Sequence, residues 1–127
     1  MEEIKIDTKK REEFIDITRE IEKKIEGHTG LVFLQVPHTT AAITINENAD
    51  PTVETDMIRK LKELIPKNDD YEHLEGNSDS HLKTSLFGST QLIYAENGKI
   101  NLGTWQGIFF CEFDGPRNRK LQIKKLN

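Results

Sequence analysis

One stretch of the chain gathers side chains that can do chemistry. Residues 71–87 read YEHLEGNSDSHLKTSLF, and each of the two histidines, His73 and His81, stands two residues from a carboxylate, Glu75 and Asp79. In an extended chain, residues i and i+2 point to the same side, so each imidazole is predicted to lie beside its carboxylate. In such pairs both groups can bind a metal, or the carboxylate can orient the imidazole that binds it. The two groups can also act as general acid and base. We therefore take these four residues as catalytic candidates.

A third imidazole, His38, follows Pro37 at the break between two predicted strands. We expect His38 to join His73 and His81 in one cluster, where each can be a metal ligand, a proton carrier or a group that orients substrate. The spacings match no standard zinc signature. Glu47, in an acidic run before a helix, is the fourth candidate ligand, since carboxylates there suit Mg²⁺. The predicted cofactor is a divalent metal, either Mg²⁺ or a transition metal such as Zn²⁺.

The segment GTWQGIFFCEF, residues 103–113, is the second unusual one. Alternation along a strand puts Gln106 and Glu112 on one face with Ile108 and Phe110, and it puts Trp105 on the other face with Phe109, Cys111 and Phe113. Polar side chains on an apolar face need partners or a cavity. Trp105 can stack on a flat ring or pack in a core or a subunit interface. Cys111, between aromatic residues, is predicted to be buried and unreactive.

Charge and composition narrow the classes of partner. The net charge of −4 argues against a nucleic-acid binder. Basic residues cluster late in the chain, where Arg117 and Arg119 can contact a phosphorylated small molecule or simply lie on a solvated edge strand. No apolar run approaches the roughly 18 residues of a membrane span, so no membrane partner is expected. A single cysteine and an acidic N-terminus without a signal peptide predict a cytoplasmic protein.

The elements that must position these groups follow from the spacing of apolar residues. Strands are predicted at residues 2–8, 31–36, 38–47, 91–95, 99–102, 104–113 and 121–126, and helices at 9–26, 50–66 and 80–87, with a polar connection over 67–80. No regular alternation of strand and helix is present. This favours an α+β fold, an antiparallel β-rich sheet or sandwich with two longer helices, in one domain over residues 1–127.

Three segments together resemble a known family. They are PHTTAAITINENADPTVETDM, YEHLEGNSDSHLKTSLFGS and NGKINLGTWQGIFFCEFDGPRNRKL, and they occur in order over most of the chain. They are similar to the YjbQ family of small proteins, also called secondary thiamine-phosphate synthase-like. The characteristic polar positions of that family are occupied here by His38, Asn46, Glu47, Asp56, His73, Glu75, Asp79, His81, Ser85, Trp105, Gln106 and Glu112.

The resemblance implies a compact α+β homotrimer with sites near the subunit contacts. It also implies thiamine-phosphate synthase activity, in which a thiazole phosphate attacks a pyrimidine methyl diphosphate and pyrophosphate is released. That activity can be a side reaction. The substrate-binding candidates are Thr39, Asn46, Ser85, Trp105, Gln106, Arg117 and Arg119.

Two classes of function remain open. The first is an enzyme that acts on a phosphorylated heterocycle, or a metal-dependent hydrolase of a phosphorylated metabolite, since a three-histidine metal site with a free position can activate water. The second is a non-catalytic trimer that binds a metal or a metabolite, favoured by the absence of an unambiguous nucleophile.

Overall fold

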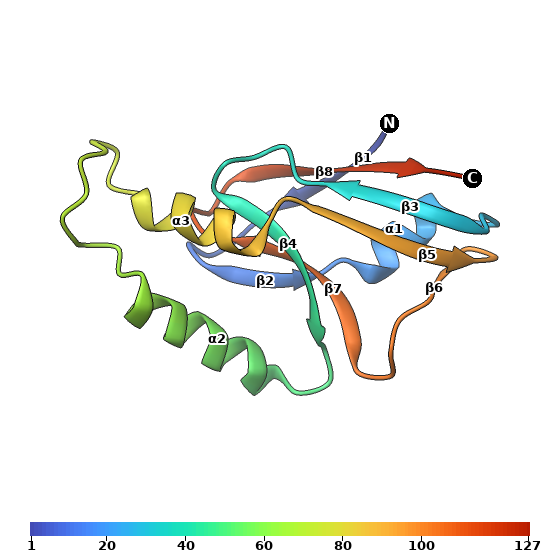
Figure 1. The fold of residues 1–127 in the computed structure, drawn as a ribbon, viewed down its shortest axis with the longest axis horizontal. Coiled ribbons are helices and arrows are strands. Elements are labelled where there is room, and N and C mark those ends of the chain that lie inside the picture. Colours follow the sequence, from blue (N-terminus) through green and yellow to red (C-terminus); the bar gives the residue numbers. More distant parts are fainter.

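The computed structural model describes residues 1–127, and it is built from eight strands and three helices (Figure 1). The strands are β1 (Glu2–Asp7), β2 (Glu13–Asp16), β3 (Gly30–Gln35), β4 (Ala41–Glu47), β5 (Thr90–Glu96), β6 (Lys99–Ile100), β7 (Gln106–Glu112) and β8 (Asn118–Lys125). The helices are α1 (Thr18–Lys24), α2 (Pro51–Leu64) and α3 (Ser78–Phe87). No helix is long and apolar enough to cross a membrane.

The strands form two antiparallel sheets. One has five strands in the order β1-β8-β3-β5-β6, and the other has three in the order β2-β7-β4. The large core lies between them, because inward-facing residues of both sheets, such as Leu34 and Leu121 from the first and Ile43 and Phe110 from the second, belong to one buried cluster. The expected α+β fold with antiparallel sheets is confirmed.

A second, smaller core covers the other face of the three-stranded sheet. Phe14, Phe109, Cys111 and Phe113 pack there against α2 and against Phe87 at the end of α3. Figure 1 shows α2, in green, beside this sheet and away from the five-stranded one. β7 is therefore covered on both faces, which explains why nearly all of its residues are buried. The predicted alternation is confirmed from Ile108 to Phe113, whereas Trp105, predicted on the face of Phe109 and Cys111, lies outside β7 and is exposed.

The helix predicted over residues 9–26 is wrong in its first half. Residues 13–16 form β2, which pairs with β7 in the register Phe14↔Cys111, and only Thr18–Lys24 are helical. Phe14 joins the small core while Ile17 and Ile21 join the large one. The helical spacing of these residues thus arises from a strand and a short helix that face different cores. Of the two longer helices expected, only the one over residues 50–66 is present as such, as α2, and the helix expected to be short, α3, is longer than α1.

The remaining elements lie within a few residues of their predicted bounds. Asp50 caps α2, where its side chain accepts a hydrogen bond from the Thr52 N–H at 2.9 Å, and Pro51 is the first helical residue. The face of α2 predicted to be buried is only partly covered: Val53, Met57 and Leu61 are half-buried and Leu64 is 68% exposed. α3 begins at Ser78, two residues earlier than expected, and this changes where its side chains point.

Candidate functional site

The three predicted histidines lie around one open pocket of about 410 Å³. His38 comes from the connection between β3 and β4, His73 from the connection before α3, and His81 from the first turns of α3. None of the lining residues is hydrophobic. The rest of the lining comprises Pro37, Thr39, Thr40, Glu75, Asn77, Arg117 and Arg119. The expected convergence of the imidazoles on one cavity is thus present within the single chain.

His38 is held by β8. Its Nε2 accepts a hydrogen bond from the backbone N–H of Lys120 at 2.9 Å, so a neutral ring carries its proton on Nδ1. Burial and the nearby Arg119 guanidinium lower the pKa of His38, which keeps the ring neutral at pH 7. The ring of His38, which lines the pocket, therefore has an N–H donor left on Nδ1 rather than a free lone pair.

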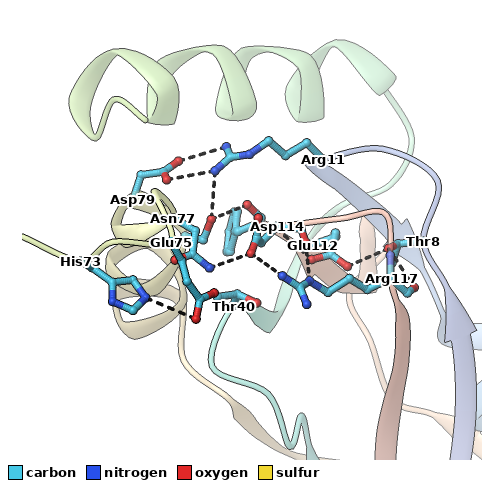
Figure 2. Close-up of polar contacts among 12 residues, drawn as sticks. Thr8, Arg11, Thr40, His73, Glu75, Asn77, Asp79, Glu112, Asp114 and Arg117 are labelled. Carbon is cyan, nitrogen blue, oxygen red and sulfur yellow. Dashed lines mark hydrogen bonds and ion pairs between the residues drawn. The ribbon is translucent and has the colours of Figure 1, made fainter. Parts of the chain in front are cut away.

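His73 and His81 contact each other edge to face, with ring centroids 5.4 Å apart and planes at 86°. His73 Nε2 lies 4.0 Å from the Glu75 carboxylate, so one of the two predicted histidine–carboxylate pairs is present (Figure 2). The side chain of His73 is 45% exposed and that of Glu75 is 70% exposed. This side of the pocket is open to solvent, and its residues make few contacts that hold them.

The opposite wall is held through Asp114. Its Oδ2 accepts hydrogen bonds from Asn77 Nδ2 and Arg117 Nη2, each at 2.8 Å, and its backbone carbonyl accepts one from Arg117 Nε (Figure 2). Asn77 Oδ1 is buried without a partner. Arg117, which is half exposed, keeps its Nη1 outside these bonds and available to an anion.

Behind the pocket lies the buried acid predicted from alternation, Glu112. Arg119 donates to both of its oxygens, from Nε at 2.8 Å and from Nη2, and Thr8 Oγ1 donates at 2.7 Å. Burial alone would raise the pKa of Glu112, but the bonds from Arg119, the Asp114 N–H and Thr8 outweigh it and lower the pKa. Arg119 also donates to the carbonyl and hydroxyl of Thr40, which fixes the segment that carries His38.

Asp79 does not join the histidines. Residues 78–87 are helical rather than extended, so Asp79 and His81 point about 160° apart around α3, to nearly opposite sides of the helix. The Asp79 carboxylate accepts two bonds from Arg11, at 3.0 and 3.1 Å (Figure 2). It also accepts one from Lys83. Burial would raise its pKa, but these two cations outweigh burial and lower it. The prediction that Asp79 lies beside the His81 ring is wrong.

Four other candidates lie at the far end of the small sheet. Asn46 and Glu47 end β4, Gln106 begins β7 opposite Glu47, and Trp105 directly precedes β7. The pocket adjoins the other end of this pair, where Ala41 faces Glu112. The six residue steps between the two ends correspond to about 20 Å. Trp105 is 63% exposed there.

Of the three remaining candidates, Thr39 lies at the pocket, and Ser85 and Asp56 do not. Thr39 lines the pocket beside His38, as expected for a substrate-binding residue. Ser85 is exposed on α3, one turn beyond His81, and does not line the pocket. Asp56, implied by the family resemblance, is exposed on α2.

The metal prediction is not supported by the donors within this chain. No three side chains of His, Cys, Asp or Glu lie close enough together to hold an ion. His38 has its Nε2 lone pair occupied by Lys120, and Glu47 lies at the far end of β4. The arrangement of His38, His73 and His81 in this chain therefore does not fit a three-histidine metal site.

Several functional residues escaped sequence reasoning. Thr8 holds Glu112 behind the pocket, and Arg11, Glu12 and Lys83 hold α3, the helix that carries His81, from its other side. Apart from the pair Asp79–Lys83, these contacts join segments more than 60 residues apart. That pair, four residues apart on a helix, is the one signal that was available.

The chain matches the family described as UPF0047 protein YjbQ-like over residues 2–127. It is 56% identical to the UPF0047 protein MJ1081 of Methanocaldococcus jannaschii, with 94% of this chain and 88% of that protein covered. It is 51% identical to YugU of Bacillus subtilis, with 97% and 96% covered. The crystal structure of the conserved hypothetical protein TT1486 from Thermus thermophilus has a TM-score of 0.97 at 46% identity, with 99% of this chain and 100% of that chain covered.

Proposed function

The chain belongs to the YjbQ-like UPF0047 family, and on that premise we propose that it is a cytoplasmic enzyme that acts on a phosphorylated small molecule in the histidine pocket. The proposed reaction is that of a thiamine-phosphate synthase, which couples a pyrimidine methyl diphosphate to a thiazole phosphate, either as the main reaction or as a side activity. The observation that carries the proposal is the grouping of three imidazoles and an accessible arginine around one polar cavity.

The chemistry of this reaction suits a pocket of donors. The bond between the pyrimidine methylene carbon and the diphosphate oxygen breaks, and its electron pair leaves with pyrophosphate. The lone pair of the thiazole nitrogen forms the new carbon–nitrogen bond, so no base has to remove a proton from the nucleophile. What the reaction needs is stabilisation of the charge that develops on the leaving oxygen.

Three groups of this chain support that role. His38 offers its Nδ1–H, held in place by Lys120 and kept neutral by burial and Arg119. Arg117 offers its Nη1, which is suited to a phosphoryl oxygen. His81, in contact with His73, can donate to the leaving oxygen or pass it a proton.

The proposed enzyme is a homotrimer in which a second subunit completes the site. Within one subunit the pocket holds no aromatic residue except the imidazoles, while Trp105 lies exposed about 20 Å away. A pyrimidine bound in the pocket therefore has no ring to stack on unless another copy supplies Trp105, together with Asn46, Glu47 and Gln106.

The test is a coupling assay with purified protein. His81→Ala is expected to reduce product formation by about 10²-fold or more while the protein stays folded. His28→Ala is the matched control, because the His28 ring hydrogen-bonds the Leu31 carbonyl and does not line the pocket. Unchanged turnover in His81→Ala, or no coupling by the unmodified protein, contradicts the proposal.

A metal-dependent hydrolase, or a trimer that only binds a metal, is the second candidate, favoured by the adjacent rings of His73 and His81. In that case further ligands must come from another subunit, and elemental analysis of the purified protein is expected to find a stoichiometric metal. Chelator is then expected to abolish hydrolysis of phosphate esters or to dissociate the trimer. Metal-free protein with full coupling activity excludes this candidate.

A further inference from the structure

Away from the histidines, a second pocket of about 370 Å³ lies between α3 and the residues that end and follow α2. Its outer lining includes Arg11, Lys62, Lys67 and Asn68, and it shares no residue with the histidine pocket. Figure 2 shows Arg11 between α2 above it and Asp79 on α3. The proposed function does not use this pocket.

The floor of this pocket is a buried cluster of charges. Lys83 Nζ lies 2.6 Å from Glu12 and 3.2 Å from Asp79, and Asp79 is also paired with Arg11. Lys83 is 0% exposed, and the side chains of Asp79 and Glu12 are 1% and 3% exposed. Because two carboxylates face two cations there, the cluster is neutral as a set.

The rim of the pocket, formed by Arg11, Lys62, Lys67 and Asn68, is positive, because the negative charges of the pocket are buried and most of the positive ones are exposed. The carboxylates are almost out of water, whereas the side chains of Arg11 and Lys62 are 29% and 62% exposed. Lys67 is exposed and makes no ion pair, and Lys62 reaches Glu12 only at 3.7 Å, beyond hydrogen-bond distance. Arg11 and Lys83 are balanced by Asp79 and Glu12, so Lys62 and Lys67 leave the pocket with an excess of two positive charges. A solute that enters the pocket therefore meets a positive surface.

We propose that this second pocket binds the phosphoryl group of a small molecule, or free phosphate. Arg11 uses three of its five N–H groups on Asp79 and Ser80, which leaves Nε–H and one Nη1–H. Two lysines stand beside this partly free guanidinium, and together they form the donor set that phosphate oxygens prefer. The net charge of −4 makes the rim a local exception, which favours a small anion over an extended polyanion.

The experiment titrates isotopically labelled protein with inorganic phosphate, pyrophosphate and glycerol phosphate at low ionic strength, followed by NMR. Saturable shifts are expected at the amides of Arg11, Lys67 and Asn68. The variant Lys62→Ala/Lys67→Ala is expected to weaken binding at this pocket by about tenfold or more, because both side chains are exposed donors. The matched control is Lys5→Ala/Lys124→Ala, which removes two exposed lysines from the five-stranded sheet.

Each outcome decides the proposal. Tighter binding of glycerol phosphate than of inorganic phosphate identifies a phosphorylated metabolite as the ligand, and the reverse order identifies free phosphate. Shifts only around His38 and Arg117, or an equal loss of affinity in the control variant, overturn the second site and leave the proposed function intact. Saturable binding here by a protein without coupling activity overturns the proposed function and leaves the second site intact.

Discussion

The two ends of the β4–β7 pair both carry a glutamate, but the glutamate is buried at one end and solvent-accessible at the other. At the end near Ala41, Glu112 is fully buried and bonded to Arg119 and Thr8, and it backs the histidine pocket. At the other end, Glu47 and Gln106 face each other beside an exposed Trp105. The first end is held by long-range hydrogen bonds, and the second lies on the surface.

This difference separates residues that hold the pocket in place from residues that can contact a ligand. A buried carboxylate with three donors holds the backbone of the pocket but cannot reach a substrate. An exposed tryptophan can reach a ligand but holds nothing in place. We expect the two ends to differ in their contribution to stability, as their burial implies, and to act together if the proposed trimer brings them side by side.

The largest effect is expected from the same substitution at both ends. Glu112→Gln leaves Arg119 buried without its anion and is expected to lower the free energy of unfolding by about 3 to 5 kcal/mol. Glu47→Gln, at the surface end, is expected to change it by less than about 0.5 kcal/mol. Urea denaturation of both variants makes the measurement. Equal losses would mean that the two ends do not differ in support.

The next effect tests whether the ends meet between subunits. Trp105→Ala is expected to lower kcat/KM of the coupling reaction by about tenfold, with partial rescue by Trp105→Phe, if stacking contributes about 1 to 3 kcal/mol. Unfolding and refolding this variant together with His81→Ala is expected to restore activity. Roughly a quarter of the contacts in random mixed trimers pair an intact Trp105 with an intact His81. Activity no higher than that of the separate variants would place both roles in one subunit or in none.

A smaller effect concerns acid. The pKa values of Glu112 and Asp79 are lowered in the folded protein, so the unfolded chain binds more protons in acid than the folded one. The stability that these groups supply is complete above the unfolded-state carboxyl pKa of about 4 and is lost as the pH falls through the lowered folded-state values. Unfolding free energies measured between pH 6 and pH 2 are expected to fall less steeply in Glu112→Gln than in Glu47→Gln. Parallel curves would show that Glu112 is not the group being titrated.

The smallest effect is a spectroscopic one at His38. Nitrogen-15 NMR of the imidazoles is expected to show the proton of His38 on Nδ1 at pH 7, because Nε2 accepts from Lys120. His38 is expected to titrate below the usual pKa of about 6.5, since burial and Arg119 disfavour its charged form. A proton on Nε2, or a normal titration, would remove His38 from its role as a neutral donor.

The pattern of apolar residues was enough to predict the antiparallel α+β fold. β3, β4, β5 and β8 alternate or run apolar in ways that only a strand explains, and the two faces of β7 could be assigned residue by residue. The failure at residues 9–26 has a physical cause. Phe14 belongs to a strand because Cys111 stands opposite it on β7, and that pairing joins residues almost 100 positions apart.

The pocket could be predicted only in part. The three histidines are chemically conspicuous, so their convergence could be guessed before their positions were known. The distance between Trp105 and the pocket could not, because it follows from the register of β4 against β7 rather than from any motif. The helix that turns Asp79 away from His81 begins only two residues before the predicted one, and boundaries of that precision lie outside what periodicity resolves.

The single thiol in the small core, Cys111, can be used to measure how often that core becomes exposed to solvent. Cys111 is fully buried among Phe14, Phe109 and Phe113, and burial raises its pKa well above the usual value. Alkylating reagents therefore cannot modify the native chain until α2 and α3 separate from the small sheet. The rate of modification then measures how often this half of the molecule comes apart, without any engineered label.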